Sequence, residues 1–319
     1  MTAAAVTLAD IHAAAGRIAG RVLRTPMLAD PLVPGLFLKQ EYRQTTGAFK
    51  LRGATNAVLS LTPDDLRRGV VTASTGNHGR ALAHAARAAG GRAVVCLSTL
   101  VPANKVQAIR DLGAEVRIIG QSQDEAMVEV AREVAKGMVE VPPFDHAAVI
   151  AGQGTLGLEI LADLSAPATV LIPVSGGGLA TGVATAIRAL SPKTRLIGLS
   201  MERGAAMAAS LQAGHPADVT ELPTLADSLG GGIGLQNRLT FTACRDLLDE
   251  VILLTEDEIA TAMRHIHAAA GDVVEGAAAV GVAAVLAGKV QVDGPTLAIL
   301  SGCNVAADRF AEVMSEGLQ

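Results

Sequence analysis

The segment TVLIPVSGGGLATG, residues 169–182, decides the fold class. Its apolar run from Val170 to Val174 has the length and composition of a buried strand. Residues 179–190 continue as an Ala-rich segment of helical character. The consecutive glycines between them let backbone amides approach one anion, and the following helix adds its positive end. A strand, a glycine turn and a helix in this order form the repeating unit of a parallel α/β sheet.

The same alternation recurs along the chain and predicts an α/β fold of two domains, each an open, twisted, parallel-type sheet flanked by helices. Buried strands are predicted at 69–73, 93–97, 115–119, 169–173, 195–200, 251–255 and 296–300, and helices at 80–89, 103–112, 124–136 and 179–190. Residues 69–146 hold three strand-helix units and are expected to form a small α/β domain. Residues 1–68 and 147–319 are expected to form the large domain.

Composition excludes several functional classes. The chain has 319 residues, of which half are apolar and only 2% aromatic, and its net charge is −5. It therefore lacks the basic field and the stacking platforms of a nucleic-acid-binding protein. Cys96, Cys244 and Cys303 are odd in number and far apart, so neither a disulfide framework nor a cysteine zinc site is indicated. No signal peptide or membrane span is evident, and we expect a cytoplasmic protein.

Lys50 lies in the stretch TGAFKLRGA, residues 46–54. Thr46 is predicted to cap a helix over 49–58, which places Lys50 in the first turn. A cation there opposes the helix dipole, and Phe49 limits its access to water, so both effects favour the neutral amine. A neutral lysine is a nucleophile suited to forming an imine with an aldehyde. The alternative is a surface lysine on an amphipathic helix.

Two further loops follow predicted strands, where open parallel sheets bind ligands. STGNHG, residues 74–79, gathers hydroxyl, amide and imidazole groups at a helix start, which suits a carboxylate, although a polar turn is an equal alternative. The loop SGCN, residues 301–304, suggests that Ser301 caps a helix. Cys303 is interpreted as a small apolar residue rather than a nucleophile, because no pairing histidine is implied.

The glycine loop at Gly176 has the character of a phosphate cup. Its spacing does not fit the dinucleotide pattern Gly-x-Gly-x-x-Gly, since Thr181 stands where the third glycine would fall. It also lacks the Gly-Lys-Ser/Thr ending of a nucleotide P-loop, so a monophosphate cofactor is indicated. The alternative is a glycine turn that serves only tight strand-helix packing.

Together these features resemble the fold type II family of pyridoxal-phosphate enzymes, specifically the threonine/serine dehydratase and serine racemase group, from about Ala19 to Asn304. The resemblance implies a tryptophan synthase β-like architecture, bound pyridoxal 5'-phosphate, a small domain that closes over the active site, and a homodimer. It implies that Lys50 forms the imine with the cofactor and that Asn77 contacts its phenolic oxygen. The implied cofactor-binding set is Lys50, Phe49, Asn77, Ser175, Gly176, Gly177, Gly178, Leu179 and Ser301, and the implied substrate-binding set is Ser74, Thr75, Gly76, Asn77, His78 and Ser228.

The Ser301 hydroxyl, matched to the group that bonds the pyridine nitrogen, would keep that nitrogen largely neutral and the ring a modest electron sink. Lys50 would then act as general base in an elimination of water from a β-hydroxy-α-amino acid. Racemases of the group place a serine opposite the lysine. Thr75 stands there instead. Its hydroxyl could serve as the second catalytic acid/base, which makes Thr75 a catalytic candidate beside Lys50, but its β-methyl crowds that face. We therefore expect a dehydratase, with amino-acid racemase as the alternative.

The stretches 201–207 and 228–234 resemble hydroxyectoine-utilization dehydratases, which implies a hydroxylated diaminobutyrate as the small amino-acid substrate. Serine, threonine and 3-hydroxyaspartate remain alternatives. Ser228, Arg203 and Arg80 are candidates for contacting its distal end. No bound metal is expected. Glu202 matches the glutamate of related metal sites, but Ala208 stands where those sites have an aspartate, and one carboxylate alone is a poor ligand set for a divalent cation. Outside enzymes, the competing interpretation is an α/β protein that only binds a phosphate ligand.

Overall fold

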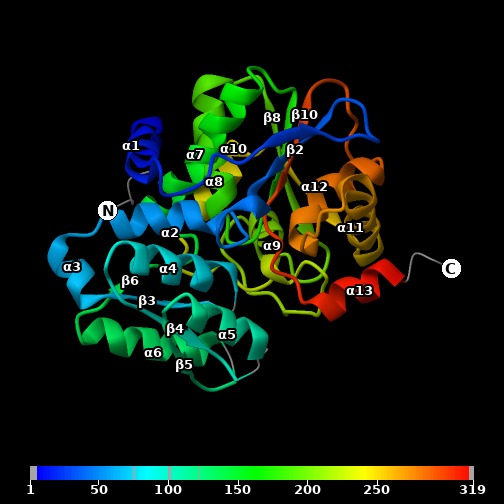
Figure 1. The fold of residues 1–319 in the computed structure, drawn as a ribbon. Coiled ribbons are helices and arrows are strands. Elements are labelled where there is room, and N and C mark those ends of the chain that lie inside the picture. The colour runs from blue at the N-terminus through cyan, green and yellow to red at the C-terminus, as the bar shows by residue number, and fades with distance from the viewer. Residues whose placement is uncertain (1–5, 75, 100, 102, 122, 316–319) are drawn as a thin grey trace.

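The computed structural model describes residues 6–74, 76–99, 101, 103–121 and 123–315. They form two sheets, each covered by helices on both faces (Figure 1). The predicted α/β class with parallel-type sheets is confirmed. Among the described residues, no helix is long and apolar enough to cross a membrane.

The larger sheet has six strands in the order β1-β2-β10-β7-β8-β9. Every neighbouring pair is parallel except β1 and β2, which are antiparallel. Its strands are β1 (Met27–Ala29), β2 (Leu36–Gln40), β7 (Thr169–Pro173), β8 (Arg195–Met201), β9 (Glu250–Leu254) and β10 (Thr296–Leu300).

The smaller sheet has four parallel strands in the order β5-β4-β3-β6. All four come from one continuous part of the chain, between Val70 and Glu140. They are β3 (Val70–Ala73), β4 (Ala93–Leu97), β5 (Glu115–Ile118) and β6 (Val139–Glu140).

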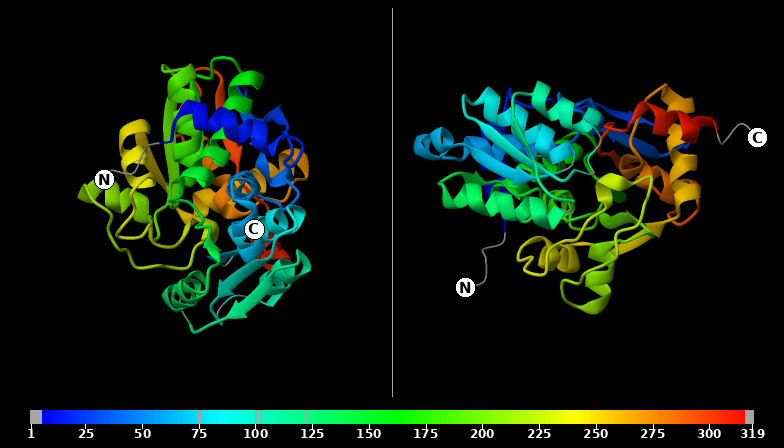
Figure 2. Two further views of the ribbon diagram at one scale, coloured as in Figure 1. Left: turned by 90° about the vertical axis from the view of Figure 1, so that its left-hand side faces the viewer. Right: turned by 90° about the horizontal axis from the view of Figure 1, so that it is seen from below.

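Helices α7 and α8 cover one face of the larger sheet, and α11 and α12 cover the other (Figure 1). Figures 1 and 2 place α1 and α13 on opposite sides of the molecule. The helices are α1 (Leu8–Ile18), α2 (Lys50–Leu59), α3 (Pro63–Arg68), α4 (Asn77–Ala88), α5 (Ala103–Asp111), α6 (Gln123–Ala135), α7 (Ala147–Asp163), α8 (Gly178–Leu190), α9 (Ala206–Ala213), α10 (Thr240–Leu247), α11 (Glu256–Ala270), α12 (Gly276–Leu286) and α13 (Ala307–Ser315), with 3-10 turns η1 (Glu41–Arg43) and η2 (Asp227–Leu229).

The alternation of side chains along each strand builds two cores from one sheet. In β10, Leu297 and Ile299 belong to the apolar cluster under α7 and α8, whereas Ala298 and Leu300 belong to the cluster under α12. This follows from the period of two in a strand, which sends successive side chains to opposite faces. A strand buried on both faces must therefore be apolar throughout, as the run 296–300 is.

Helices α7 and α8 approach closely enough to exclude side chains at their contact. A Cβ on Gly182 would collide with the carbonyl oxygen of Ile150 and lie 2.5 Å from the backbone nitrogen of Gly154. Glycine at this crossing keeps the helices in direct contact, which suits a core built mainly from small residues.

The seven predicted strands are all present, with bounds within one residue of those expected. Two of them, β5 and β9, were wrongly predicted to be buried: each lies at the edge of its sheet, and most of its residues are partly exposed. Strands β1, β2 and β6 were not predicted from the sequence. β1 and β6 have three and two residues, too few to show a hydrophobic period, and β2 carries the buried polar Lys39 and Gln40.

Strand register brings distant segments to one edge of the larger sheet. Leu300 at the end of β10 pairs with Gln40 at the end of β2, and β10 also pairs with β7. The chain after each of these parallel strands therefore leaves from the same edge. The segments that follow contain Lys50, the Ser301 loop and the Gly176 loop.

Candidate active site

The Lys50 segment and the Ser301 loop are joined by backbone hydrogen bonds. The Phe49 N–H donates to the Ser301 carbonyl at 3.0 Å, and the Cys303 N–H donates to the Gly47 carbonyl at 2.9 Å. Ala48 and Gly302 form an antiparallel bridge between them. These contacts fix the start of α2 beside the end of β10.

Lys50 is the first residue of α2, which confirms its place in the first turn. The predicted cap was wrong. The N-cap is Phe49, which makes no side-chain cap bond, and the Thr46 hydroxyl is buried without a hydrogen-bond partner among the described residues. The reason is that Gly47 takes φ of 76° and the chain pairs with the Ser301 loop before the helix begins.

The Lys50 amine is held in a position that favours its neutral form. It donates to the Pro143 carbonyl at 2.9 Å and lies 5.2 Å from the centroid of the Phe49 ring. Burial lowers the pKa of Lys50 to about 8, and the nearby Glu275 carboxylate limits the shift. Near neutral pH a useful fraction of the amine is therefore unprotonated and nucleophilic.

The predicted carboxylate nest lies between β3 and α4, with Asn77 as the first residue of the helix. The Ser74 hydroxyl accepts from the Gly79 N–H at 3.1 Å and from the Gly76 N–H at 3.4 Å. Ser74 thus closes the turn that exposes the start of α4. Thr75, which the sequence analysis predicts to be catalytic and substrate-binding, lies outside the described residues.

His78 is buried, and its Nε2 lies 2.8 Å from the Val141 carbonyl oxygen. A carbonyl only accepts, so Nε2 carries the hydrogen and Nδ1 is left as an acceptor. Burial and the Lys50 charge lower the pKa of His78 to about 3, so the ring is neutral. The imidazole has no N–H to offer a carboxylate, and only the backbone of His78 can contribute to such a site.

The Gly176 loop joins β7 to α8, and its surroundings leave no space for side chains at the glycine positions. Gly177 is the N-cap of α8 with φ of 84°, and a Cβ there would lie 2.9 Å from the Cys244 sulfur. A Cβ on Gly176 would collide with the Phe144 ring. The first N–H groups of α8 have no acceptor within the helix, as at every helix start. This combination fits the phosphate group of the expected cofactor.

Glu275, which the sequence analysis did not single out, connects these segments. Its Oε1 accepts from Asn77 Nδ2 at 2.9 Å, and its Oε2 accepts from the Asn304 N–H at 3.2 Å. Burial, reinforced by the charge of Asp227, raises the pKa of Glu275 to about 7. The signal available in the sequence was one carboxylate between the apolar pair 273–274 and the Gly/Ala-rich run 276–286.

Ser301 is buried at the end of β10, where its carbonyl binds the Lys50 segment. The prediction that Ser301 caps a helix was wrong, because the next helix, α13, begins only at Ala307. The Cys303 thiol donates to the Tyr42 carbonyl at 3.6 Å, and burial raises its pKa. A thiol with a raised pKa is a poor nucleophile, in agreement with the sequence analysis.

The candidates for contacting the distal end of the substrate separate into two groups. Ser228 is exposed, and its hydroxyl lies 3.5 Å from Asn77 Nδ2, so it faces the site. Arg203 instead donates to the Pro223 carbonyl at 2.9 Å on the surface. The Arg80 Nε is buried without a hydrogen-bond partner among the described residues.

No group of three metal-ligating side chains occurs within the part of the chain that the structure describes. Glu202, the carboxylate considered for a metal, is exposed.

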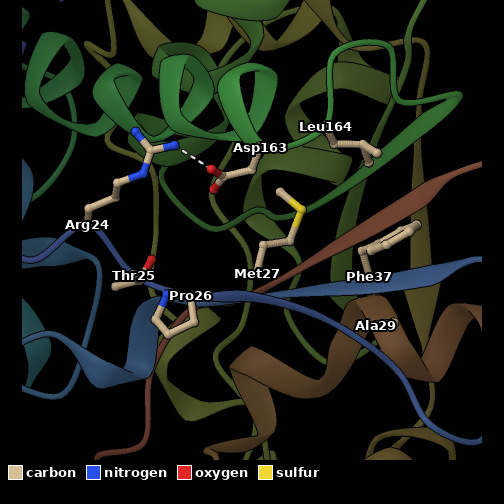
Figure 3. Close-up of a pocket in the computed structure, with 8 residues that line it drawn as sticks. All are labelled: Arg24, Thr25, Pro26, Met27, Ala29, Phe37, Asp163 and Leu164. Carbon is tan, nitrogen blue, oxygen red and sulfur yellow. Dashed lines mark hydrogen bonds and ion pairs between the residues drawn. The ribbon is translucent and has the colours of Figure 1, made fainter.

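A pocket of about 440 Å³ lies elsewhere, on the larger sheet beside the end of α7 (Figure 3). Arg24, paired with Asp163, lines one side, and Met27 and Phe37 lie on β1 and β2. None of the predicted site residues contributes to its lining.

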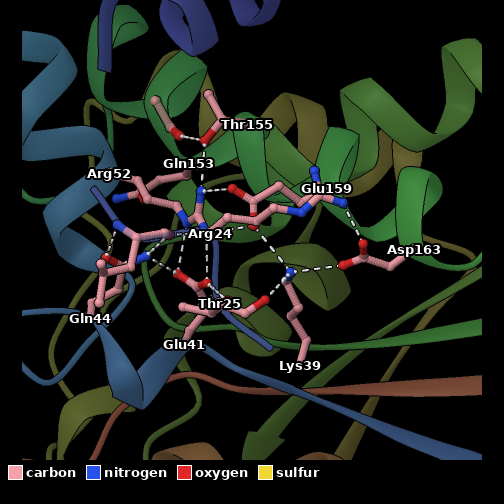
Figure 4. A network of polar contacts seen from close by, with 12 residues as sticks. Arg24, Thr25, Lys39, Glu41, Gln44, Arg52, Gln153, Thr155, Glu159 and Asp163 are labelled. Carbon is pink, nitrogen blue, oxygen red and sulfur yellow. Dashed lines mark hydrogen bonds and ion pairs between the residues drawn. The ribbon is translucent and has the colours of Figure 1, made fainter. Parts of the chain in front are cut away.

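Behind α2 lies a buried ionic cluster, which we define as Lys39, Glu41, Arg52 and Glu159 (Figure 4). Arg52 bonds Glu41 and Glu159, each at 2.7 Å, and Lys39 lies 3.1 Å from Glu159. The cluster has two cations and two anions, so its charges balance. It anchors α2 two residues after Lys50.

Comparisons with known proteins agree with this geometry. The family described as pyridoxal-phosphate dependent enzyme matches residues 18–302. A putative threonine dehydratase of Sinorhizobium fredii is 53% identical over 97% of this chain and 96% of its own, and an L-threonine ammonia-lyase of Thermotoga maritima is 39% identical over 98% and 79%. The structure of maize serine racemase superposes with a TM-score of 0.91 at 32% identity, covering 99% of this chain and 98% of that one.

Proposed function

The chain belongs to the pyridoxal-phosphate dependent enzyme family, and from this premise we propose that it eliminates water from a β-hydroxy-α-amino acid. It uses pyridoxal 5'-phosphate and is an ammonia-lyase of the threonine/serine dehydratase type. Family membership removes the alternative of a protein that only binds a phosphate ligand. The observation that carries the proposal is the Lys50 amine, with its pKa lowered to about 8, at the sheet edge shared by the Gly176 and Ser301 loops.

We propose the following residues for holding the cofactor. Lys50 would bind its aldehyde carbon, and the backbone around Gly177 would bind its phosphate. The Ser301 hydroxyl would face the pyridine nitrogen, and Asn77 the phenolic oxygen. The remaining members of the proposed set, Phe49, Ser175, Gly176, Gly178 and Leu179, border these groups.

When bound, pyridoxal 5'-phosphate draws electrons from the substrate α-carbon and so acidifies its Cα–H bond. Lys50 would take that proton, because an amine with a pKa near the working pH is an efficient general base. The backbone amides of Asn77 and His78 at the start of α4 would hold the substrate carboxylate. The β-hydroxyl leaves with a proton as water, and water later displaces the nitrogen. The net products are a 2-oxo acid and ammonium.

Elimination is favoured over racemisation by the groups available for proton transfer. Racemisation needs a second acid/base on the face opposite Lys50, and the residue proposed for it, Thr75, carries a crowding β-methyl. The neighbouring ring of His78 is neutral, with its Nε2 hydrogen already bound to Val141. Lys50 is thus proposed as the single base.

We propose a hydroxyectoine-derived hydroxylated diaminobutyrate as substrate, with threonine, serine and 3-hydroxyaspartate as the competing candidates. The support is the resemblance of residues 201–207 and 228–234 to dehydratases of hydroxyectoine use, together with the position of Ser228. Its exposed hydroxyl lies beside Asn77 and could bind a polar group at the distal end of a substrate. The threonine dehydratases among the relatives favour threonine instead.

One panel of incubations tests the reaction and its substrate. The purified holoenzyme is incubated with L-serine, L-threonine, threo-3-hydroxyaspartate and hydroxylated diaminobutyrates, and ammonia, 2-oxo acid and enantiomer ratio are measured. We expect ammonia without the D-enantiomer, fastest with a hydroxylated diaminobutyrate. Accumulation of D-amino acid without ammonia would establish a racemase, and a preference for threonine would overturn the substrate assignment.

We also propose that residues 69–146 act as a small domain that closes over the site, with 1–68 and 147–319 as the large domain. The support is that the four-stranded sheet is drawn wholly from this stretch. An ion pair at 2.8 Å between Lys105 and Asp227 crosses from the small domain to η2. Small-angle scattering with and without substrate would test closure, and an unchanged radius of gyration would contradict it.

A cytoplasmic homodimer is the proposed working form. Three leucines near the edge strand β1 are each at least half exposed in the single chain: Leu23, Leu28 and Leu32. Exposed apolar residues that lie close together are typical of a surface that a second subunit covers. The cysteines are unpaired, as expected in a reducing compartment. Sedimentation at micromolar concentration and cell fractionation test the two parts of this proposal.

A further inference from the structure

Glu275 is placed as a helix cap but does not act as one. It is the N-cap residue of α12, yet its side chain makes no cap bond to that helix, and only 2% of the residue is exposed. Its two carboxylate oxygens accept instead from Asn77 of α4 and from the backbone of Asn304. The Glu275 carboxylate therefore connects α4 and the loop after β10 instead of capping its own helix.

The orientation of the Asn77 carboxamide follows from a chain of donors and acceptors that starts outside the site. The Thr46 carbonyl can only accept, so the Asn304 group facing it at 3.0 Å must be the Nδ2 amide. The second hydrogen of that amide donates to Asn77 Oδ1 at 2.5 Å. Asn77 must therefore turn its own Nδ2 toward Glu275, which accepts from it at 2.9 Å.

This arrangement leaves one hydrogen of Asn77 available. Nδ2 carries two hydrogens, and Glu275 takes one of them. The other reaches only the Ser228 hydroxyl, at 3.5 Å, which is too long for a strong bond. An anionic oxygen placed at this position would therefore gain a donor whose direction is already set.

Two glycines make room for the network. A Cβ on Gly302 would lie 2.8 Å from Glu275 Oε1, and a Cβ on Gly47 would lie 2.7 Å from Asn304 Oδ1. Both glycines belong to the backbone pairing that holds Lys50 beside the Ser301 loop. The same close approach that positions Lys50 thus admits the side chains that hold Asn77.

We propose that Glu275 and Asn304 are positioning residues that fix the Asn77 carboxamide, so that its remaining Nδ2 hydrogen points to the phenolic oxygen of the cofactor. The inference rests on the proposed role of Asn77. It assigns to Glu275 an action through Asn77 rather than contact with the reacting atoms.

The hydrogen bonds of Glu275 also depend on pH. Asn77, the Asn304 backbone and the Ser228 hydroxyl all donate to the Glu275 carboxylate, so its ionised form satisfies them and its protonated form leaves one facing an O–H. Because its pKa is raised to about 7, the network is complete above that pH and is disrupted as pH falls through it. The titratable or charged groups that act on Glu275 or feel its charge are Lys50 of α2, Lys105 of α5, Asp227 of η2 and Cys303.

The test uses cofactor affinity and the visible spectrum of the bound cofactor between pH 5.5 and 9. In the wild type we expect a spectral inflection near pH 7. Glu275→Gln must present its Nε2 to one of the two donors, so we expect about tenfold weaker cofactor binding and loss of this inflection. Glu275→Asp keeps the charge and should retain an inflection at a shifted pH.

Asn304→Ala removes the side chain that donates to Asn77 Oδ1, and it provides an independent test if Glu275→Gln does not fold. It should weaken cofactor binding while leaving the Glu275 titration in place. Glu250→Gln at the amino end of β9 is the matched control, and it should leave affinity and spectrum unchanged.

Unchanged cofactor affinity and an unchanged inflection in Glu275→Gln would overturn the inference while leaving the proposed function intact. A wild type without any Lys50-dependent visible band would instead refute the assignment of Lys50, and the inference with it. Loss of affinity without loss of the inflection would show that another group titrates, and would also overturn the role of Glu275 in the pH response.

Discussion

The buried ionic cluster and the charges around Lys50 meet on one helix, where Arg52 follows Lys50 by two residues, yet the two regions have opposite effects on the charges they bury. In the cluster, Arg52 is surrounded by carboxylates, which raise its pKa, while its own charge lowers the pKa of Glu41. In the site, burial lowers the pKa of Lys50 to about 8 and raises that of Glu275 to about 7.

Pairing determines whether a buried group keeps its charge. A charge that is fully paired and hydrogen-bonded stays ionised and serves structure. A charge that is buried without such a partner moves toward neutrality and becomes able to exchange a proton near physiological pH. One helix, α2, carries both kinds of residue, so the ion pairs of Arg52 also hold the helix that carries the Lys50 amine.

The largest effect is expected from a substitution of Lys50 in the candidate active site. Lys50→Ala should remove the visible band of the bound cofactor and lower kcat for ammonia release by at least about a thousandfold, since both the nucleophile and the base are lost. Lys289→Ala, which removes a surface lysine paired with Glu258, is the control and should keep both. A Lys50→Ala protein that retained the band would place the cofactor elsewhere.

On the structural side, Arg52→Met should reduce the free energy of unfolding by about 3–5 kcal/mol, because the fully buried Glu41 would lose its only ion-pair partner in the cluster, while Glu159 would keep Lys39. Urea denaturation of the cofactor-free protein measures this change. Arg195→Met breaks an exposed pair with Glu250 and should cost less than about 1 kcal/mol. Equal losses in the two variants would contradict the distinction between paired buried and exposed charges.

The two regions should also differ in how stability depends on pH. Glu275 has a folded pKa of about 7 against 4.5 for the free group, so the unfolded chain loses its proton first and stability falls as pH rises between these values. Lys50 has a folded pKa of about 8 against 10.5, so stability recovers as pH rises from about 8 to 10.5.

His78 acts against Glu275 in the acid range, because its folded pKa of about 3 lies below the 6.5 of the free ring and its contribution to stability rises with pH between these values. The groups are therefore separated by comparing each variant with the wild type in urea titrations of the cofactor-free protein. Relative to the wild type, Glu275→Gln should gain roughly 1–3 kcal/mol of stability as pH rises from about 4.5 to 7, and Lys50→Met should lose a similar amount as pH rises from about 8 to 10.5. A difference that stays constant across either range would contradict the prediction.

The smallest expected effect comes from removing divalent metal. Glu202 is exposed and has no second carboxylate at Ala208, and one carboxylate makes a weak site for Mg²⁺ or Ca²⁺. EDTA should leave the rate of ammonia release unchanged. A collapse of the rate with EDTA and its return with Mg²⁺ would reveal a metal role that these residues do not suggest.

The elements that the sequence predicted well share one physical property. Strands such as β7 and β10 are buried on both faces and are therefore apolar throughout, so the chain itself records their environment. The errors fall where tertiary contacts override local preference. Thr46 has a side chain suited to an N-cap, but the pairing of Ala48 with Gly302 delays the start of the helix to Lys50. Ser301 is followed by a loop, and the next helix begins only at Ala307.

The α/β class could be read from the sequence, which also predicts a reactive Lys50 and an anion-binding Gly176 loop, because periodicity, glycine content and position relative to strands are local properties. Only the tertiary structure decided which partners those groups have. Glu275 and Asn304 meet Asn77 across three separate segments, and the neutral state of His78 depends on burial beside Lys50. Hydrogen bonds and desolvation depend on distances between residues far apart in the chain, and those distances exist only once the parallel strands have brought their carboxyl ends to one edge.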